Sequence, residues 1–199
     1  MDRLGSCERS SHETQLRCAI RLPAQAADAA LELEISTGVP FLDHMLEQTG
    51  RYGSFHLRLL GTGDIQVDPH HLLEDAGIVL GEALSRALGD RAGIVRFSSA
   101  YAPLDDALAR VVLDLGKRPY LAYGLGLRGR IGSLESETIE EWWRAFSIHA
   151  GATIHVDCIR GHNRHHVAEA AFKALGLALR QAVAQEGGAG TPSSKGLLG

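Results

Sequence analysis

The stretch HHLLEDAGIVLGEAL (residues 70–84) returns 95 residues later as HHVAEAAFKALGLAL (residues 165–179). Three side chains that can bind metal keep this spacing, because 165 − 70, 166 − 71 and 169 − 74 each equal 95: His70/His165, His71/His166 and Glu74/Glu169. Apolar and small positions continue the repeat at Ala76/Ala171, Leu80/Leu175, Gly81/Gly176, Ala83/Ala178 and Leu84/Leu179. Self-similarity at one fixed offset indicates a supersecondary unit that is used twice. We therefore predict two homologous halves around a shared centre.

Apolar periodicity outside the repeated motif predicts similar elements in both halves. Spacings of three and four indicate long helices at 72–88 and 167–183, and shorter helices are expected at 43–49 and 137–149. Alternation of apolar and polar residues predicts strands at 16–22, 31–35, 55–59, 65–67, 108–115, 120–127 and 152–159. Helices packed on one face of antiparallel sheets would bury these patterns. The expected fold is α+β with internal pseudo-twofold symmetry, divided into residues 1–92, residues 93–186 and a tail at 187–199.

The composition limits the classes of protein that this chain can represent. Its 199 residues are 45% hydrophobic and 22% charged, which is enough to build a core. A formal net charge of −4 argues against a general nucleic-acid or membrane-surface binder, since such proteins carry a basic surface. The chain lacks an apolar run long enough to span a membrane and an apolar secretion signal, so we expect a cytoplasmic protein. Its three scattered cysteines predict neither a disulfide framework nor a thiolate zinc site.

The spacing of the two HHxxE motifs predicts how their side chains divide between metal ions. On a helix, positions i and i+4 differ by about 40°, whereas i+1 is turned by about 100°. His70 can therefore chelate one ion with Glu74, and His165 can chelate another with Glu169, while the second histidine of each pair points elsewhere. If the halves face one another, the two sites exchange these second histidines. Imidazole and carboxylate ligands suit Mn²⁺, Fe²⁺, Co²⁺ or Zn²⁺, and spacing alone does not choose among them.

Motifs along nearly the whole chain resemble those of the imidazoleglycerol-phosphate dehydratase family. They are TGVPFLDHML (37–46), DPHHLLEDAGIVLGEAL (68–84), PLDDALARVVLDLGKRPYL (103–121), GHNRHHVAEAAFKALGLALRQA (161–182) and PSSKGLL (192–198). The resemblance implies a hydro-lyase of histidine biosynthesis that dehydrates imidazole glycerol phosphate to imidazole acetol phosphate. It also implies two Mn²⁺ ions per active site, and a homo-oligomer of 24 subunits built from trimers with active sites between subunits.

The resemblance also implies a role for individual residues. One manganese ion would take His44, His71, His165 and Glu169, and the other would take His70, Glu74, His166 and Glu141. Glu141 departs from the family's pattern, which has a histidine there, but a carboxylate oxygen is also a suitable Mn²⁺ ligand. Proton transfer is expected from Glu13 or Glu169, and a contact with the substrate hydroxyls from Gln48. The phosphate would be bound by Arg96, Arg118, Lys173, Ser193 and Lys195.

Two other functions are compatible with a histidine–carboxylate cluster. A non-catalytic assembly protein would use metal ions to join subunits and would have no use for phosphate-binding cations near them. A metal-dependent hydrolase would activate water at an open coordination position and would not need two ions spaced for one five-membered ring.

Overall fold

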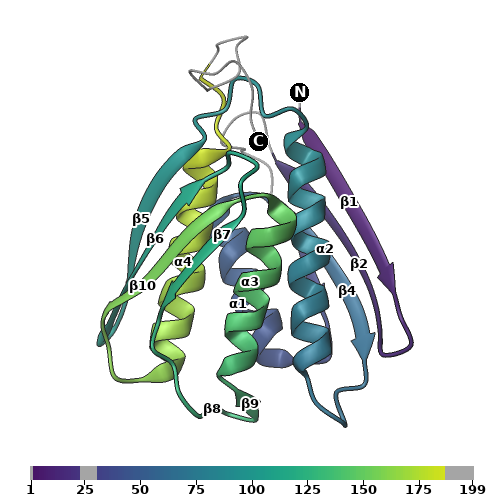
Figure 1. Ribbon diagram of the computed structural model, residues 1–199, viewed down its shortest axis with the longest axis vertical. Coiled ribbons are helices and arrows are strands. Elements are labelled where there is room, and N and C mark those ends of the chain that lie inside the picture. Colours follow the sequence, from purple (N-terminus) through teal and green to yellow (C-terminus); the bar gives the residue numbers. More distant parts are fainter. Residues whose placement is uncertain (1, 23–30, 187–199) are drawn as a thin grey trace.

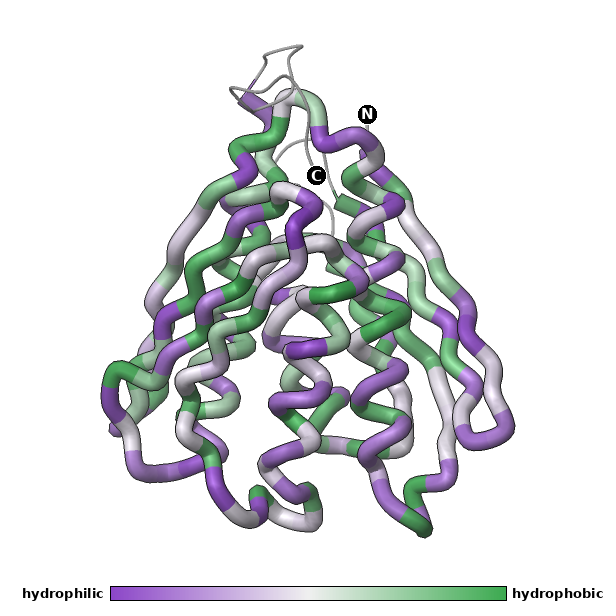
Figure 2. The backbone as a smooth tube through the Cα atoms, in the orientation of Figure 1, coloured by the Kyte–Doolittle hydropathy of each residue, from purple (hydrophilic) through white to green (hydrophobic). Residues whose placement is uncertain are grey.

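The computed structural model describes residues 2–22 and 31–186, which form ten strands and four helices. Two four-stranded sheets lie on the outside of the molecule, and the four helices lie between them (Figure 1). One hydrophobic core contains buried side chains from both sheets and all four helices. Hydrophobic segments accordingly line the interior of the backbone trace in Figure 2. The predicted α+β class is confirmed.

The first sheet has the strand order β1–β2–β4–β3. Its strands are β1 (Arg3–Ser10), β2 (Thr14–Leu22), β3 (Leu33–Ser36) and β4 (His56–Gly63). The β1–β2 and β2–β4 pairs are antiparallel, whereas β3 and β4 are parallel. Parallel neighbours need a crossover connection, which is here the helix α1 (Pro40–Gly53). The helix α2 (His70–Leu88) follows β4 and packs on the inner face of this sheet.

The second sheet repeats this arrangement with the strand order β5–β6–β10–β7. Its strands are β5 (Phe97–Leu104), β6 (Ala107–Asp114), β7 (Tyr120–Gly124) and β10 (Thr153–Arg160). The β7–β10 pair is parallel, and α3 (Glu137–Ala150) provides the crossover. A small hairpin of β8 (Arg130–Ile131) and β9 (Leu134–Glu135) precedes α3, and α4 (Arg164–Ala182) covers the sheet. The order of elements thus confirms the predicted duplication, with one parallel edge pair in each otherwise antiparallel sheet.

Helices from opposite halves pack closely at the repeated glycines. A Cβ atom on Gly81 of α2 would lie 2.8 Å from Ala150 N and 2.9 Å from Phe146 O of α3. A Cβ atom on Gly176 of α4 would lie 2.5 Å from Thr49 O and 2.9 Å from Gly53 N of α1. Because both contacts are to backbone atoms, a side chain at either position would force the helices apart. The repeated glycine therefore marks the crossing of α2 with α3 and of α4 with α1.

The fold departs from the sequence expectations at several elements. The strands β1 and β5 and the hairpin of β8 and β9 were not predicted, and each sheet contains one parallel pair where antiparallel sheets were expected. The predicted strand at 65–67 is wrong: Ile65 and Val67 are 42% and 74% exposed and belong to a turn that ends at Pro69, before α2. Arg91, which is buried, donates to the carbonyl oxygens of Leu115 (2.8 Å), Gly151 (2.9 Å) and Ala150 (2.6 Å). It thereby joins the segment after α2 to the ends of β6 and α3. The proposed boundary at residue 92 falls between α2 and β5.

Candidate metal centre

The two HHxxE motifs form the first turns of α2 and α4, which begin at the same end of the molecule (Figure 1). Asn163 caps α4, and its Oδ1 accepts the backbone N–H groups of His165 (3.0 Å) and His166 (3.4 Å). In α2 the corresponding support comes from Asp68, whose Oδ1 accepts the N–H of His70 at 2.7 Å. These caps satisfy backbone donors that a helix start leaves unpaired. They fix the backbone from which the imidazoles project.

His44, His165 and Glu169 form the one group of three metal-capable side chains found among the described residues. Their ligand atoms all lie within 4.8 Å of one another. Glu169 Oε2 is 3.2 Å from His44 Nε2 and 3.1 Å from His165 Nε2, so it lies between the two imidazoles. The crossing of α1 with α4 produces this arrangement, which requires residues from both halves of the chain. Two nitrogen donors and one oxygen donor fit a divalent transition-metal ion such as Mn²⁺.

The Glu169 carboxyl is held in its ionised form. Burial alone would raise its pKa, but the hydrogen bond and charge of Lys173, together with His44, outweigh burial and lower the pKa below its ordinary value. Lys173 Nζ lies 2.8 Å from Glu169 Oε1, so each oxygen of this carboxylate has its own partners. Gln48 lies one turn after His44 on α1, with Nε2 3.5 Å from His44 Nδ1. An ionised carboxylate and an imidazole with its Nε2 turned inward are the forms that bind metal.

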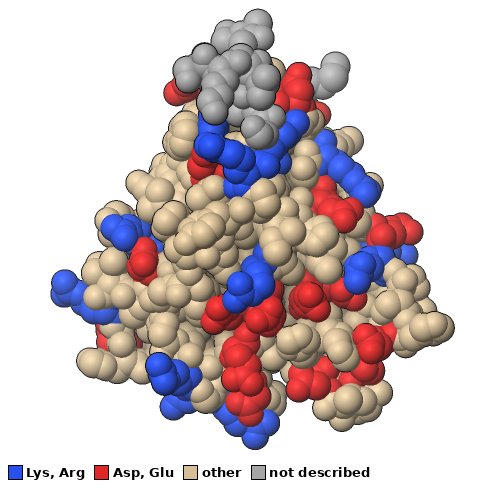
Figure 3. Space-filling view, viewed as in Figure 1, with Lys and Arg blue, Asp and Glu red and all other residues tan. Residues whose placement is uncertain are grey.

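A second group, related to the first by pseudo-symmetry, is not brought together among the described residues. The helices α1 and α3 are both 14 residues long, and aligning their first residues pairs His44 with Glu141. The counterparts of His165 and Glu169 are then His70 and Glu74 at the start of α2, against which α3 packs. Glu141 Oε2 instead lies 3.4 Å from Arg144 Nε. Acidic side chains with basic ones above them gather on the surface over the region of α3 (Figure 3).

The second histidine of each motif, His71 or His166, faces a nearby carboxylate. It does not face the metal-capable residues of the other half of the chain. His166 Nδ1 lies 2.6 Å from Asp106 Oδ1. His71 Nδ1 lies 3.6 Å from both Glu13 Oε2 and Asp64 Oδ1. The backbone N–H groups of residues 162 and 163, followed by the His166 side chain, hold the pKa of Asp106 well below its usual range. Among the described residues, no hydrogen bond, ion pair or ring contact joins His166 to His70 or Glu74, so the predicted exchange of histidines is not seen within one chain.

The predicted phosphate-binding arginines lie far from the imidazoles of the same chain. Arg96 Nε is 2.7 Å from Asp114 Oδ1, and Arg118 Nη2 is 3.9 Å from Asp114 Oδ2, so both cations meet one carboxylate. Asp114 ends β6, whereas Asp106 and the start of α4 lie at its other end. An eight-residue strand is about 25 Å long. Lys173 lies instead beside Glu169, and Ser193 and Lys195 lie outside the described residues.

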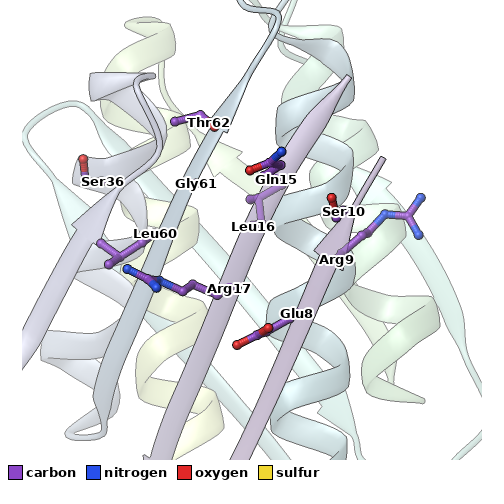
Figure 4. Close-up of a pocket in the computed structure, with 10 residues that line it drawn as sticks. All are labelled: Glu8, Arg9, Ser10, Gln15, Leu16, Arg17, Ser36, Leu60, Gly61 and Thr62. Atoms are coloured by element: carbon purple, nitrogen blue, oxygen red, sulfur yellow. The ribbon is translucent and has the colours of Figure 1, made fainter. Parts of the chain in front are cut away.

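Of the hollows along the first sheet, two bear on the position of the site. One of about 650 Å³ crosses β1, β2 and β4 and is lined by polar and charged side chains such as Arg9, Gln15 and Arg17, without any of the predicted metal ligands (Figure 4). Because it contains no histidine and no opposed pair of carboxylates, we do not assign the chemistry to it. The other, of about 330 Å³, is lined by residues 11–15, 62–64 and 66. It includes Glu13 and Asp64, the two carboxylates that face His71.

Sequence reasoning named Glu13 only as a proton-transfer residue, and it did not identify Asp64 or Asp106 as partners of the second histidines. A signal was available, because Glu13 and Asp106 are each the second residue of the turn that joins the first two strands of a half. Applying the repeat to these turns, and not only to the helices, pairs Glu13 with Asp106. The same approach applied to α1 and α3 pairs His44 with Glu141.

Comparisons with known proteins find similarity along nearly the whole chain. Residues 37–179 match the family described as imidazoleglycerol-phosphate dehydratase. Proteins of that name from Moorella thermoacetica and Phaffia rhodozyma are 48% and 45% identical, over 100% and 98% of this chain and 100% and 96% of theirs. A crystal structure of the Staphylococcus aureus enzyme aligns with a TM-score of 0.77 at 38% identity, covering 92% of this chain and 99% of that one.

The structure of the Pyrococcus furiosus enzyme in complex with (S)-C348 aligns with a TM-score of 0.82 at 34% identity, covering 96% of this chain and all of that one. None of the helices in the described part of the chain has the length and apolar character needed to cross a membrane. Full-length similarity and the shared fold both lead to the same assignment. The chain belongs to the imidazoleglycerol-phosphate dehydratase family.

Proposed function

We propose that this chain dehydrates imidazole glycerol phosphate to imidazole acetol phosphate in cytoplasmic histidine biosynthesis, with two Mn²⁺ ions in each active site. The observation that carries the proposal is the group of His44, His165 and Glu169, in a chain of this family. Its donor atoms suit Mn²⁺, and the Glu169 carboxylate is ionised before any metal binds.

The proposed ligands of one ion are His44, His71, His165 and Glu169, and those of the other are His70, Glu74, Glu141 and His166. The bound ions would supply Lewis acidity that stabilises negative charge as it develops on the substrate's imidazole ring. Glu141 and Glu74 give the second group two carboxylates, whereas the first group has one. The contact between Glu141 and Arg144 partly neutralises this extra charge in the metal-free chain.

Proton transfer is assigned to Glu13. Dehydration requires removal of a proton from one carbon and departure of the hydroxyl group from the neighbouring carbon, and a carboxylate close to the substrate can act as the base. Glu13 is exposed at a turn, and its Oε2 lies 3.6 Å from His71 Nδ1, a proposed ligand. Glu169 is less suited to this role, because its two oxygens already contact Lys173, His44 and His165. We therefore assign Glu169 to holding the metal.

The phosphate would be bound by Arg96, Arg118 and Lys173 and by the tail residues Ser193 and Lys195. Arg96 and Arg118 lie a full strand length, about 25 Å, from the imidazole end of their own chain. A small substrate cannot bridge that distance, so a complete active site needs the imidazole end of one subunit and the arginine end of another. This separation supports active sites between chains, and the proposed number of 24 subunits built from trimers rests on the family resemblance alone.

Metal dependence is tested by removing and restoring manganese. The protein is stripped with a chelator, and turnover of imidazole glycerol phosphate is measured with and without added Mn²⁺. We expect turnover only with Mn²⁺, and we expect His165→Ala to abolish it. Absence of turnover in both conditions would favour the non-catalytic assembly protein, and hydrolysis of the phosphate without dehydration would favour the hydrolase.

The shared active site is tested by mixing two inactive variants. His166→Ala removes an imidazole from one end of the subunit, and Arg96→Ala removes a guanidinium from the other. An equal mixture of the two variants is unfolded and refolded together. If each active site combines the imidazole end of one subunit with the arginine end of another, roughly a quarter of the sites should contain both intact side chains. Activity should then reappear in the mixture and in neither variant refolded alone. An inactive mixture that assembles normally would show that one chain supplies both groups.

A further inference from the structure

Asp106 uses its two carboxylate oxygens for two different purposes. Oδ2 accepts the backbone N–H groups of His162 (2.6 Å) and Asn163 (3.0 Å), immediately before α4. Oδ1 lies 2.6 Å from His166 Nδ1. Asn163 in turn caps the helix through the N–H groups of His165 and His166. The turn between β5 and β6 is thereby tied to the start of the helix that carries the imidazoles.

The contact with Asp106 also determines which nitrogen of His166 carries a proton. An ionised carboxylate can only accept hydrogen bonds, so Nδ1 must be the donor in a 2.6 Å contact. In the neutral imidazole Nε2 then has no proton, and its lone pair is available to a cation. We propose that Asp106 is a positioning residue that orients His166 and fixes it as an Nε2 metal ligand. This inference rests on the proposed function, in which His166 binds the second metal ion.

The first half of the chain has the same arrangement around His71. The turn of residues 12–13 between β1 and β2 corresponds to residues 105–106 between β5 and β6, so Glu13 corresponds to Asp106. Glu13 and Asp64 each bring an oxygen to 3.6 Å from His71 Nδ1. His71 Nδ1 and Asp64 Oδ1 are buried atoms without a hydrogen-bond partner, because 3.6 Å is too long for a hydrogen bond between them. Both second histidines thus turn Nδ1 toward carboxylates of their own half.

The two corresponding carboxylates, Asp106 and Glu13, nevertheless differ in how firmly their neighbours hold them. Asp106 contacts three donors within 3.0 Å, two of which are backbone groups, so it is locked in place. Glu13 approaches its histidine only to 3.6 Å and is exposed. We infer that the duplicated carboxylate has taken two roles: Asp106 holds a ligand, and Glu13 remains free for proton transfer.

The test is a pair of substitutions at Asp106, measured by metal binding as well as by turnover. Asp106→Asn keeps an oxygen acceptor for the backbone N–H groups but presents an NH₂ donor to Nδ1, which favours the wrong tautomer. Asp106→Glu keeps the carboxylate. Metal-free protein is titrated with Mn²⁺, and free Mn²⁺ is followed by electron paramagnetic resonance. Loss of a carboxylate partner of a ligating histidine typically lowers metal affinity about 10- to 100-fold.

We expect two tight Mn²⁺ sites per wild-type chain, one tight and one weakened site in Asp106→Asn, and near wild-type binding in Asp106→Glu. Asp90→Asn is the matched control, because Asp90 Oδ1 also accepts a backbone N–H, that of Ala92 at 2.9 Å, but contacts no imidazole. Two unchanged sites in Asp106→Asn would overturn the inference, as would equal weakening in both Asp106 variants. A wild-type chain that binds no Mn²⁺ would instead overturn the proposed function.

Discussion

Gly176→Ala should weaken both the fold and one metal site, because Gly176 lies where α4 crosses α1. The added Cβ would lie 2.5 Å from Thr49 O, whereas favourable contacts between such atoms begin near 3.5 Å. The helices must therefore separate by roughly 1 Å, and forced overpacking of this kind costs about 1–3 kcal/mol. For a chain of this length each kcal/mol lowers the melting temperature by about 2–4 °C. Because α1 carries His44 and α4 carries Glu169, the 3.2 Å contact between them should lengthen.

Thermal unfolding of the metal-free protein and Mn²⁺ titration measure these two effects. Gly50→Ala is the control, since it makes the same change in α1 but meets the flexible side chain of Leu33 at 2.6 Å and should cost little. Gly81→Ala is the mirror variant, which should loosen α2 from α3 and weaken the other metal site. A Gly176→Ala protein that melts like Gly50→Ala, or that loses both sites equally, would refute the reasoning.

Three further predictions follow from other contacts. Arg91→Met should destabilise the fold by about 3 kcal/mol or more, because it removes the donor from two buried carbonyl groups and one partly buried one, and chemical denaturation measures this loss. The lowered pKa of Glu169 means that it stabilises the metal-free fold above about pH 4.3, and that this stabilisation is lost as the pH falls through the lower folded-state pKa. Lys173→Met should flatten that acid dependence in denaturation curves, and parallel curves for variant and wild type would contradict the assignment. Asp75→Asn weakens the contacts of Asp75 with Thr14 and Arg9, which hold the turn that carries Glu13. We therefore expect kcat to fall by a larger factor than KM changes, while the metal content of the protein stays the same.

The sequence predicted those parts of the fold that depend on local periodicity. Helices α2 and α4 could be identified because both their apolar spacing and their metal-capable residues repeat at the same offset. The strand expected at 65–67 failed because three alternating residues do not distinguish a strand from an exposed turn that precedes a proline. The parallel edge pairs were also missed, since strand direction depends on where the crossover helix returns the chain.

Local spacing along the chain predicted only part of the group of His44, His165 and Glu169. The i, i+4 spacing brought His165 to Glu169, and His44 joined them only through the tertiary crossing of α1 with α4. Local spacing does not indicate that Asp106 contacts His166, because the two residues are 60 positions apart, and only the repeat that pairs Asp106 with Glu13 singles Asp106 out. The separation of Arg96 from the imidazoles likewise depends on the direction in which β6 runs.

This separation of cationic and imidazole ends has a consequence for inhibition and for evolution. If the active site is shared as proposed, a compound that binds between neighbouring subunits and separates them slightly would inactivate the enzyme. Such a compound would need neither to resemble the substrate nor to contact a catalytic residue. Natural selection would then preserve the shape of the contact surfaces as strictly as it preserves the chemistry, since drift in either surface would misalign the active site.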